Sequence, residues 1–246
     1  MGVFADILEG MDNKKREKSA RMEKRDSIEN LPPEEWHPEL IDIYQIFTYS
    51  KLKEMHLEAN CPFDVTPGHV NLWGVRNRKR VLFDDRMCDI IGAAWLDKDT
   101  RKQKVARYQG TTRPGKHYVS VKHMLNKLGA AILIPGYHKD IWVIGTHRGK
   151  HYPCLVSRKH KGCLPTTIGR DFDHDGLLGD DESRHVGWNG INCHMGWWGK
   201  KIKRSSAGCQ VVADPREHRR LMDIAMNDPR YKKSKNFRFS YSLLIH

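Results

Sequence analysis

The sequence predicts a mainly β domain with a few helices, preceded by a helical N-terminal extension. Short apolar runs separated by turn residues follow Gly68, which is typical of strands in a β-rich domain. Before that point, apolar residues repeat at helical spacing from Leu40 to His56. Thr66-Pro67-Gly68 marks the boundary between the two patterns. The expected parts are a charged arm over 1–30, a helical linker over 31–65 and the β-rich domain over 66–246.

The N-terminal part is expected to begin with a short amphipathic helix. Val3–Met11 places apolar residues at helical spacing, and the charged run Asp12–Asn30 predicts a solvated helix or a disordered arm. The arm is either a flexible tail or a segment that docks on a partner by its apolar end. Leu31-Pro32-Pro33 then starts the linker helix, because proline suits a first helical turn.

The rest of the chain is expected to form short strands and two helices. Strands are predicted at Val70–Val75, Val81–Phe83, Lys104–Tyr108, Ile132–Ile134, Ile141–Ile144 and Cys154–Val156, and one starts at Gln210. A helix is expected at Val121–Leu128. Asp214-Pro215 predicts the cap of another helix that ends near Met226, because aspartate accepts from helix N–H groups. Phe237–Ile245 alternates with a period of two and predicts a half-buried strand.

The composition indicates a basic protein with a large solvated surface. The net charge is +13, the isoelectric point is about 9.5 and the mean hydropathy is −0.69. An anionic partner is therefore expected. Nucleic acid and anionic cell wall both fit, but nucleic-acid binding rests on charge alone and is not favoured. Six cysteines without a CxxC pair indicate reduced thiols, and neither a signal peptide nor a membrane span is visible.

The acidic stretch that begins at Asp171 matches a twelve-residue calcium loop. Asp171, Asp173 and Asp175 occupy positions one, three and five, and Glu182 occupies position twelve. The carbonyl of Leu177 would supply the ligand at position seven. Alternating carboxylates converge on one hard cation, so we expect a structural calcium ion here. The alternative is an aspartate-rich turn that stays solvated.

The candidate for chemistry is the pair His194 and Cys209, fifteen residues apart. A thiol becomes nucleophilic when a neighbouring base or positive charge favours the thiolate, and imidazole is the usual base. Gly208 lets the backbone turn tightly, so that amide N–H groups can face a developing oxyanion. The hydroxyl of Ser206 is expected to orient the histidine. The alternative is that both are ordinary buried residues.

This stretch resembles the active-site signature of the L,D-transpeptidase catalytic domain, a β-rich fold that acts on bacterial cell-wall peptides. That signature has His-Gly, a loop, and Ser-His-Gly-Cys followed closely by arginine. The matching positions are His194, Ser206, Gly208 and Cys209. Ala207 stands at the place of the second histidine of the family, and Val211 stands at the place of its arginine.

The variant Ser-Ala-Gly-Cys-Gln-Val is similar to a branch associated with tailed bacteriophages. The wider pattern of that branch is matched at Val70–Arg76, Gly110–Gly115, Gly145–His147 and Arg170–Asp171. The resemblance covers Thr66 to His246. It implies a tail-associated cell-wall hydrolase in the virion, or in the host cytoplasm before release, with residues 1–60 available to bind other virion proteins.

The resemblance also implies roles for individual residues. Cys209 would attack a stem-peptide carbonyl of peptidoglycan, and His194 would act as the base. The side chains expected to bind the substrate are Asn192, Trp197, Arg204 and Gln210. Trp197 and Arg204 belong to a loop of aromatic and cationic residues, which suits a sugar–peptide polymer or a nucleic acid.

Two other interpretations stay open. The departures at Ala207 and Val211, together with the charged arm, favour a virion structural or attachment protein with a degenerate fold of this kind. A zinc metallopeptidase would use Cys193, His194, His185 and Cys209 as ligands. Neither an HExxH nor a CxxC spacing supports the zinc site.

Overall fold

A computed structural model describes residues 46–77, 85–148, 151–172, 184–197, 199 and 201–246. The arm over 1–30, residues 31–45 of the expected linker and the strand expected at Val81–Phe83 lie outside these residues. The described part of the chain is mainly β, as the sequence predicts.

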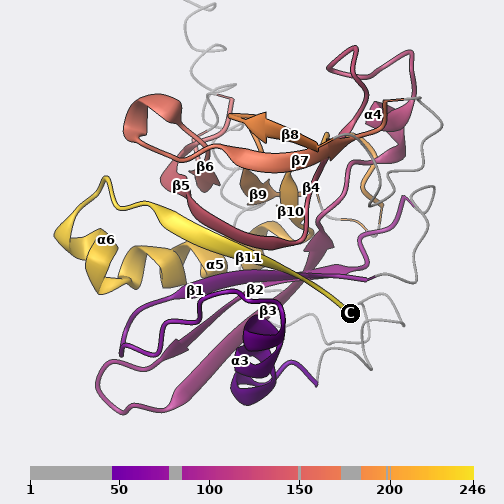
Figure 1. Cartoon of the computed structure of the whole chain (residues 1–246). Helices are drawn as coiled ribbons and strands as arrows, with labels where there is room; N and C mark the ends of the chain where they lie inside the picture. The colour runs from indigo at the N-terminus through magenta and orange to yellow at the C-terminus, as the bar shows by residue number, and fades with distance from the viewer. Residues whose placement is uncertain (1–45, 78–84, 149–150, 173–183, 198, 200) are drawn as a thin grey trace, which may run out of the picture. The chain divides into compact units, whose positions relative to one another are not determined.

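Eight strands of the described residues form a closed barrel in the order β1-β11-β5-β6-β9-β10-β3-β2 (Figure 1). Their bounds are β1 Asn71–Arg76, β2 Asp89–Leu96, β3 Gln103–Thr111, β5 Gly136–Thr146, β6 Pro153–Val156, β9 Cys193–Met195, β10 Gln210–Val212 and β11 Phe239–Ile245. The pairs β1–β11 and β9–β10 are parallel, and the other neighbours are antiparallel. A separate three-stranded sheet has the order β4-β7-β8, with β4 Ala131–Leu133, β7 Thr166–Arg170 and β8 Arg184–Gly187.

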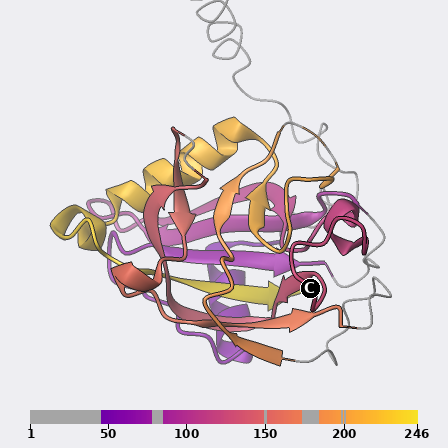
Figure 2. The ribbon, with the colours of Figure 1, turned by 90° about the horizontal axis from the view of Figure 1, so that it is seen from above.

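The core fills the barrel and continues under helix α5, Pro215–Asn227. Trp142 of β5 and Tyr241 of β11 are about 1% exposed, and their ring centroids lie 4.7 Å apart. Leu221 and Met222 bring the apolar face of α5 into the same cluster. The helix lies along one side of the barrel (Figure 2), where it contacts β6, β9, β10, β2 and β3. As expected, Asp214 caps it by accepting from the N–H of Arg216 at 2.7 Å.

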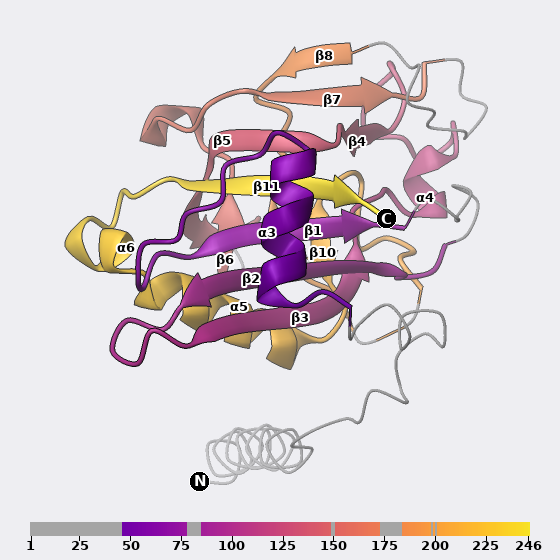
Figure 3. The same ribbon diagram turned by 60° about the horizontal axis from the view of Figure 1, so that its bottom comes forward.

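Helix α3, Tyr49–Glu58, covers another face of the barrel, across β11, β2 and β3 (Figure 3). Thr48 caps it by accepting from Lys51 N–H at 3.2 Å, and Leu52 faces the barrel fully buried. The part of the expected linker that the structure describes is therefore packed on the β-rich domain. No helix in the described ranges is long and apolar enough to cross a membrane.

The remaining described helices are short. Lys116–Val119 forms α4, Pro229–Lys233 forms α6, and Lys159–Lys161 forms a single 3₁₀ turn. The helix expected at Val121–Leu128 is wrong, because that stretch forms turns and bends. Its apolar side chains have no core to cover: Val121 is 59% exposed and Leu125 is 62% exposed. Burial of an apolar face, which stabilises most helices in proteins, is missing there.

Most predicted strands are confirmed, but their burial differs from the expectation at β11. This strand is buried on both faces from Tyr241 to Leu244, where half-burial was expected, because α3 covers the outside of the barrel. No bounds were predicted for the strands β2, β7, β8 and β9. In β2 the run Asp-Ile-Ile-Gly-Ala-Ala-Trp-Leu is buried between two neighbouring strands and shows no period-two pattern.

Candidate active site

The parallel pair β9–β10 brings the two candidate catalytic residues to one end of the barrel. In this pair Gln210 lies opposite Cys193, and Val211 lies opposite His194. The N–H of Gln210 donates to the carbonyl of Asn192 at 2.8 Å, which fixes the register. Cys209 precedes β10 and is thus aligned with Asn192, which lies two residues before His194. The fold brings together residues that are fifteen positions apart in the sequence.

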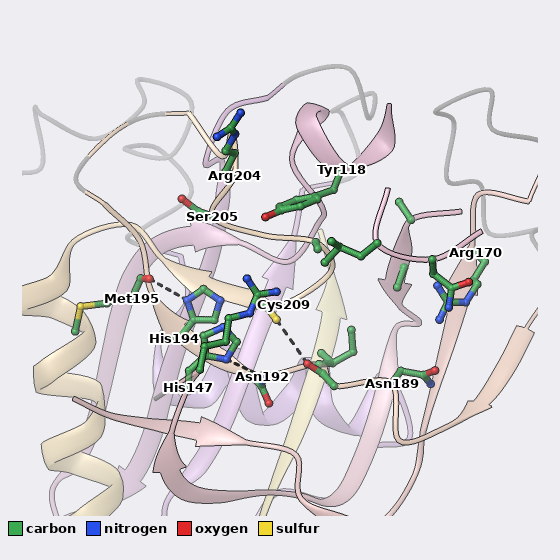
Figure 4. A pocket seen from close by; sticks show the side chains of 18 of the residues that line it. Tyr118, His147, Arg170, Asn189, Asn192, His194, Met195, Arg204, Ser205 and Cys209 are labelled. Atoms are coloured by element: carbon green, nitrogen blue, oxygen red, sulfur yellow. Dashed lines mark hydrogen bonds between the residues drawn. The ribbon is translucent and has the colours of Figure 1, made fainter. Parts of the chain in front are cut away.

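Cys209 opens into a cleft with a volume of about 600 Å³ (Figure 4). Its lining includes His194, His147, Asn192 and Trp197, as well as the arginines Arg148, Arg158, Arg170 and Arg204. Of the four side chains expected to bind a substrate, Asn192, Trp197 and Arg204 line this cleft. Trp197 is 71% exposed at its rim.

The turn before Cys209 is held by Ser206 and requires glycine at position 208. The hydroxyl of Ser206 donates to the carbonyl of Cys209 at 2.7 Å and accepts from the N–H of Gly208 at 3.1 Å. Gly208 has φ = +125°, and a Cβ atom there would lie 2.6 Å from the carbonyl oxygen of Ala131. The expectation that Ser206 orients His194 is corrected: its only proton goes to the backbone of the cysteine turn, which it locks.

Gln210 is also reassigned, from substrate binding to support of this turn. It is fully buried, its amide donates to the Gly208 carbonyl at 3.5 Å, and its oxygen accepts from the Tyr241 hydroxyl at 3.0 Å. Side chains alternate along a strand, so a residue next to the cleft-facing Cys209 points to the other side of the sheet. A substrate in the cleft therefore does not reach Gln210.

The hydrogen bond of His194 assigns its tautomer. Its Nδ1 lies 2.9 Å from the carbonyl oxygen of Met195, and a carbonyl only accepts, so Nδ1 carries the proton. In the neutral ring the lone pair is then on Nε2, the atom that can take a proton from a thiol. His194 is 7% exposed, and its ring stacks on that of His147 with centroids 4.5 Å apart and an interplanar angle of 12°.

His147, which follows β5, lies half-buried in the cleft. Asn192 holds it there. The Asn192 side-chain oxygen accepts from the N–H of Ser157 at 2.9 Å, so the amide NH₂ faces His147 Nδ1, at 3.0 Å, and donates to it. The proton of the neutral His147 ring is therefore on Nε2. Asn192 fixes a second imidazole beside the candidate base.

The thiol of Cys209 is neutral at rest. Its Sγ donates to the carbonyl of Gly190 over 3.7 Å. Burial raises its pKa above the ordinary value, and the backbone N–H of Asn192 and the charge of Arg148 lower it by less. A base must therefore remove the proton before the sulfur can attack. The Cys209 N–H has no hydrogen-bond partner among the described residues, so this amide is available to an oxyanion.

The other five cysteines differ from Cys209 because all of them are buried, and all six are free thiols. Burial raises the pKa of Cys154 to about 12 and raises that of Cys193 further. These two thiols pack in the interior and are inert. Among the cysteines, only Cys209 combines partial exposure with a cleft.

The metal predictions have separate outcomes. Asp173, Asp175, Leu177 and Glu182 of the expected calcium loop lie outside the described residues, and Asp171 is fully buried. Within the described ranges no three His, Cys, Asp or Glu side chains gather as a metal site. All four proposed zinc ligands lie within those ranges, and His185 belongs to β8 of the separate sheet. The zinc site is therefore not supported.

The residues that sequence reasoning did not place in the site are His147, Arg148, Arg158 and Arg170. They follow or end strands that are distant in sequence from Cys209, and the fold brings them together from the barrel strands β5 and β6 and from β7 of the separate sheet. Comparison of the chain with family models, with curated proteins and with solved structures gives no match.

Proposed function

We propose that this protein is a cysteine-dependent enzyme that acts on peptidoglycan stem peptides through an acyl-enzyme. The observation that carries the proposal is the position of Cys209, a half-exposed thiol that opens into the same cleft as the imidazole of His194. The resemblance of this stretch to the L,D-transpeptidase signature supplies the substrate class. A tail-associated hydrolase of a bacteriophage is the proposed setting, with residues 1–60 as the segment that binds other virion proteins.

In the proposed first step the thiol of Cys209 turns from Gly190 toward His194, whose Nε2 takes its proton. The sulfur attacks the carbonyl carbon of a stem peptide, and the oxygen takes a negative charge that the Cys209 N–H stabilises. The C–N bond then breaks, and the leaving amine takes the proton from His194. A thioester remains on Cys209.

In the second step His194 takes a proton from water, which attacks the thioester. The C–S bond then breaks, the carboxylic acid is released and ionises in water, and the proton on His194 returns to the sulfur, so the enzyme is regenerated. An amine in place of water would give a new peptide bond instead. Asn192 holds His147 against the ring of His194, which restricts how that ring can turn during both proton transfers.

The alternative is a virion structural or attachment protein that keeps the fold without the reaction. The raised pKa of the Cys209 thiol favours it, because an attacking cysteine usually has a lowered one. Ala207 and Val211, at the places of the family histidine and arginine, favour it as well.

Digestion of purified peptidoglycan sacculi by the full chain and by Cys209→Ala tests the proposal. Released fragments are identified by mass spectrometry, with the thiol reduced, in calcium and in a chelator. New peptide ends are expected from the native protein and not from Cys209→Ala. Cys154→Ala, which removes a buried thiol outside the cleft lining, should keep the activity. Equal release by the native protein and Cys209→Ala, or no release by either in calcium, would favour the structural alternative.

A further inference from the structure

The cleft around Cys209 holds four arginines and, among the described residues that line it, no carboxylate. These are Arg148, Arg158, Arg170 and Arg204. None of the four forms an ion pair with a described residue. Positive charges that line a concave surface without acids concentrate the field in the cleft and attract anions.

Arg170 is the most buried of the four. It ends β7, and its side chain is 9% exposed, so its charge is largely removed from water. One N–H of the guanidinium donates to the carbonyl of Gly129 at 3.0 Å, which restrains the position of the group. A guanidinium has five N–H donors, and burial lowers the pKa of this one. A buried cation without a counter-ion is unfavourable unless a ligand supplies the anion.

Arg148 and Arg170 lie at different places relative to the thiol. Arg148 and Cys209 line the same cleft, and the charge of Arg148 lowers the pKa of the Cys209 thiol against the larger effect of burial. In Figure 4, Arg170 lies well to one side of Cys209 and His194, and Arg204 lies on another side. The positive charge is therefore distributed along the cleft rather than gathered at the sulfur. A ligand with a single anionic group would satisfy one of these positions and leave the others unpaired.

We propose that the cleft selects acidic peptides, with one free carboxylate bound by Arg148 near the thiol and a second bound by Arg170. This inference rests on the proposed function, since it names the charge of the stem peptide that the same site takes. Arginine suits this task, because its planar fork of donors matches a carboxylate with two parallel hydrogen bonds. Conversion of the carboxylates to carboxamides removes both the charge and this match.

An acidic peptide fits the cleft better than a nucleic acid does. Among the described residues that line it, the aromatic side chains other than the two stacked histidines are Tyr118, Tyr152 and Trp197, fewer than the four arginines. Proteins that bind single-stranded nucleic acid use aromatic side chains on which successive bases stack. The cleft also contains a thiol and an imidazole, which act on acyl groups. A single-stranded oligonucleotide therefore serves as the competitor in the titration that follows.

The test is binding to the full chain with Cys209→Ala, so that no turnover occurs. Isothermal titration compares a disaccharide–peptide fragment of peptidoglycan that has free carboxylates with the same fragment in which they are carboxamides. Amidation is expected to weaken binding by about tenfold or more, because charge-assisted pairs are lost. With Arg170→Gln or Arg148→Gln added, the same amidation should weaken binding only about threefold. Arg219→Gln, an exposed arginine of α5 outside the cleft lining, should keep the full tenfold effect.

The outcomes separate this inference from the proposed function. Equal binding of the two fragments overturns the charge selection, even when the native protein cleaves sacculi. Tight, charge-dependent binding supports the selection, even when no cleavage is found. If neither fragment binds, the charge selection is overturned. It is also overturned if a single-stranded oligonucleotide binds more tightly than the acidic fragment and displaces that fragment.

Discussion

Two regions of this protein hold arginines in opposite ways. Where β1 begins, Arg230 is paired with Asp228 at 2.7 Å and with Asp64 at 3.2 Å, and it also donates to the carbonyl of Val70 at 3.1 Å. In the cleft, Arg170 is more buried than Arg230, and its hydrogen-bond partner within the described ranges is the backbone carbonyl of Gly129. The first region ties α6 to the barrel. The second region has positive charge that the described part of the protein does not neutralise.

The presence or absence of a counter-ion separates structural from functional charges in a basic protein. A cation that is paired inside the fold contributes to stability, and its removal leaves a carboxylate without a partner. A cation that is held in a cleft without a counter-ion contributes little to stability, and its removal should change binding instead. The net charge alone does not distinguish the two cases.

The largest effect on stability is expected from Asp228→Ala. This carboxylate is fully buried, caps α6, accepts from the N–H of Val70 at 2.9 Å and binds Arg230. Its loss should lower the free energy of unfolding by roughly 3 kcal/mol, because several charge-assisted bonds are lost at once. Denaturant unfolding measures the change. Asp223→Asn, at an exposed position on α5, should change it by less than about 0.5 kcal/mol.

A smaller effect is expected at the thiol when Arg148 is changed to glutamine. Arg148 lowers the pKa of Cys209 against the larger effect of burial, so its removal should raise that pKa further. Less thiolate is then present at any pH below the pKa. Alkylation by iodoacetamide at pH 8 should slow about two- to fivefold, and the pH at which the rate levels off should move upward.

Both alkylation profiles should rise with pH beyond the ordinary pKa of a cysteine, because the native thiol also has a raised pKa. Peptide mapping confirms that the label is on Cys209. Arg219→Gln serves as the control and should leave the profile in place. An unchanged profile in Arg148→Gln would show that the charge of Arg148 does not affect the pKa of Cys209.

The smallest effect is expected for Arg170→Gln, whose influence on the free energy of unfolding should contrast with that of Asp228→Ala. Glutamine removes a buried charge while keeping an amide that can donate to Gly129. The free energy of unfolding should stay within about 0.5 kcal/mol of the native value or rise, because the desolvation of a cation is no longer required. Denaturant unfolding in the absence of ligand is the measurement. A loss above about 2 kcal/mol would show that Arg170 has a structural role like that of Arg230.

Local signals explain what the sequence could predict. The spacing of His194, Gly208 and Cys209 predicts one site, because the tight turn before the thiol requires glycine and this requirement is visible in a short stretch of sequence. The cap at Asp214 was predicted for the same reason, since capping depends on neighbouring residues. Because side chains alternate along a strand, the sequence also allows the inference that Gln210 faces away from the cleft that Cys209 faces. The resemblance to the family motif instead implied that Gln210 binds the substrate.

Non-local features explain what the sequence could not predict. His147 and Arg170 reach the cleft only through the pairing of strands that are distant in sequence. The strand β2 lacked a signal because burial on both faces removes the alternation that identifies a strand. The helix expected at Val121–Leu128 failed for the opposite reason: its apolar spacing is present, but Val121 and Leu125 stay exposed in the part of the chain that the structure describes.

The position of β11 has a consequence for how the protein is made. This strand is inserted between β1 and β5, pairing Tyr241 with Leu72 on one side and with His138 on the other. On the ribosome the nascent chain therefore presents β1 and β5 with open edges until residues 239–245 emerge. Such high contact order predicts slow folding, and a chaperone that shields strand edges during synthesis would act on this protein before the barrel closes.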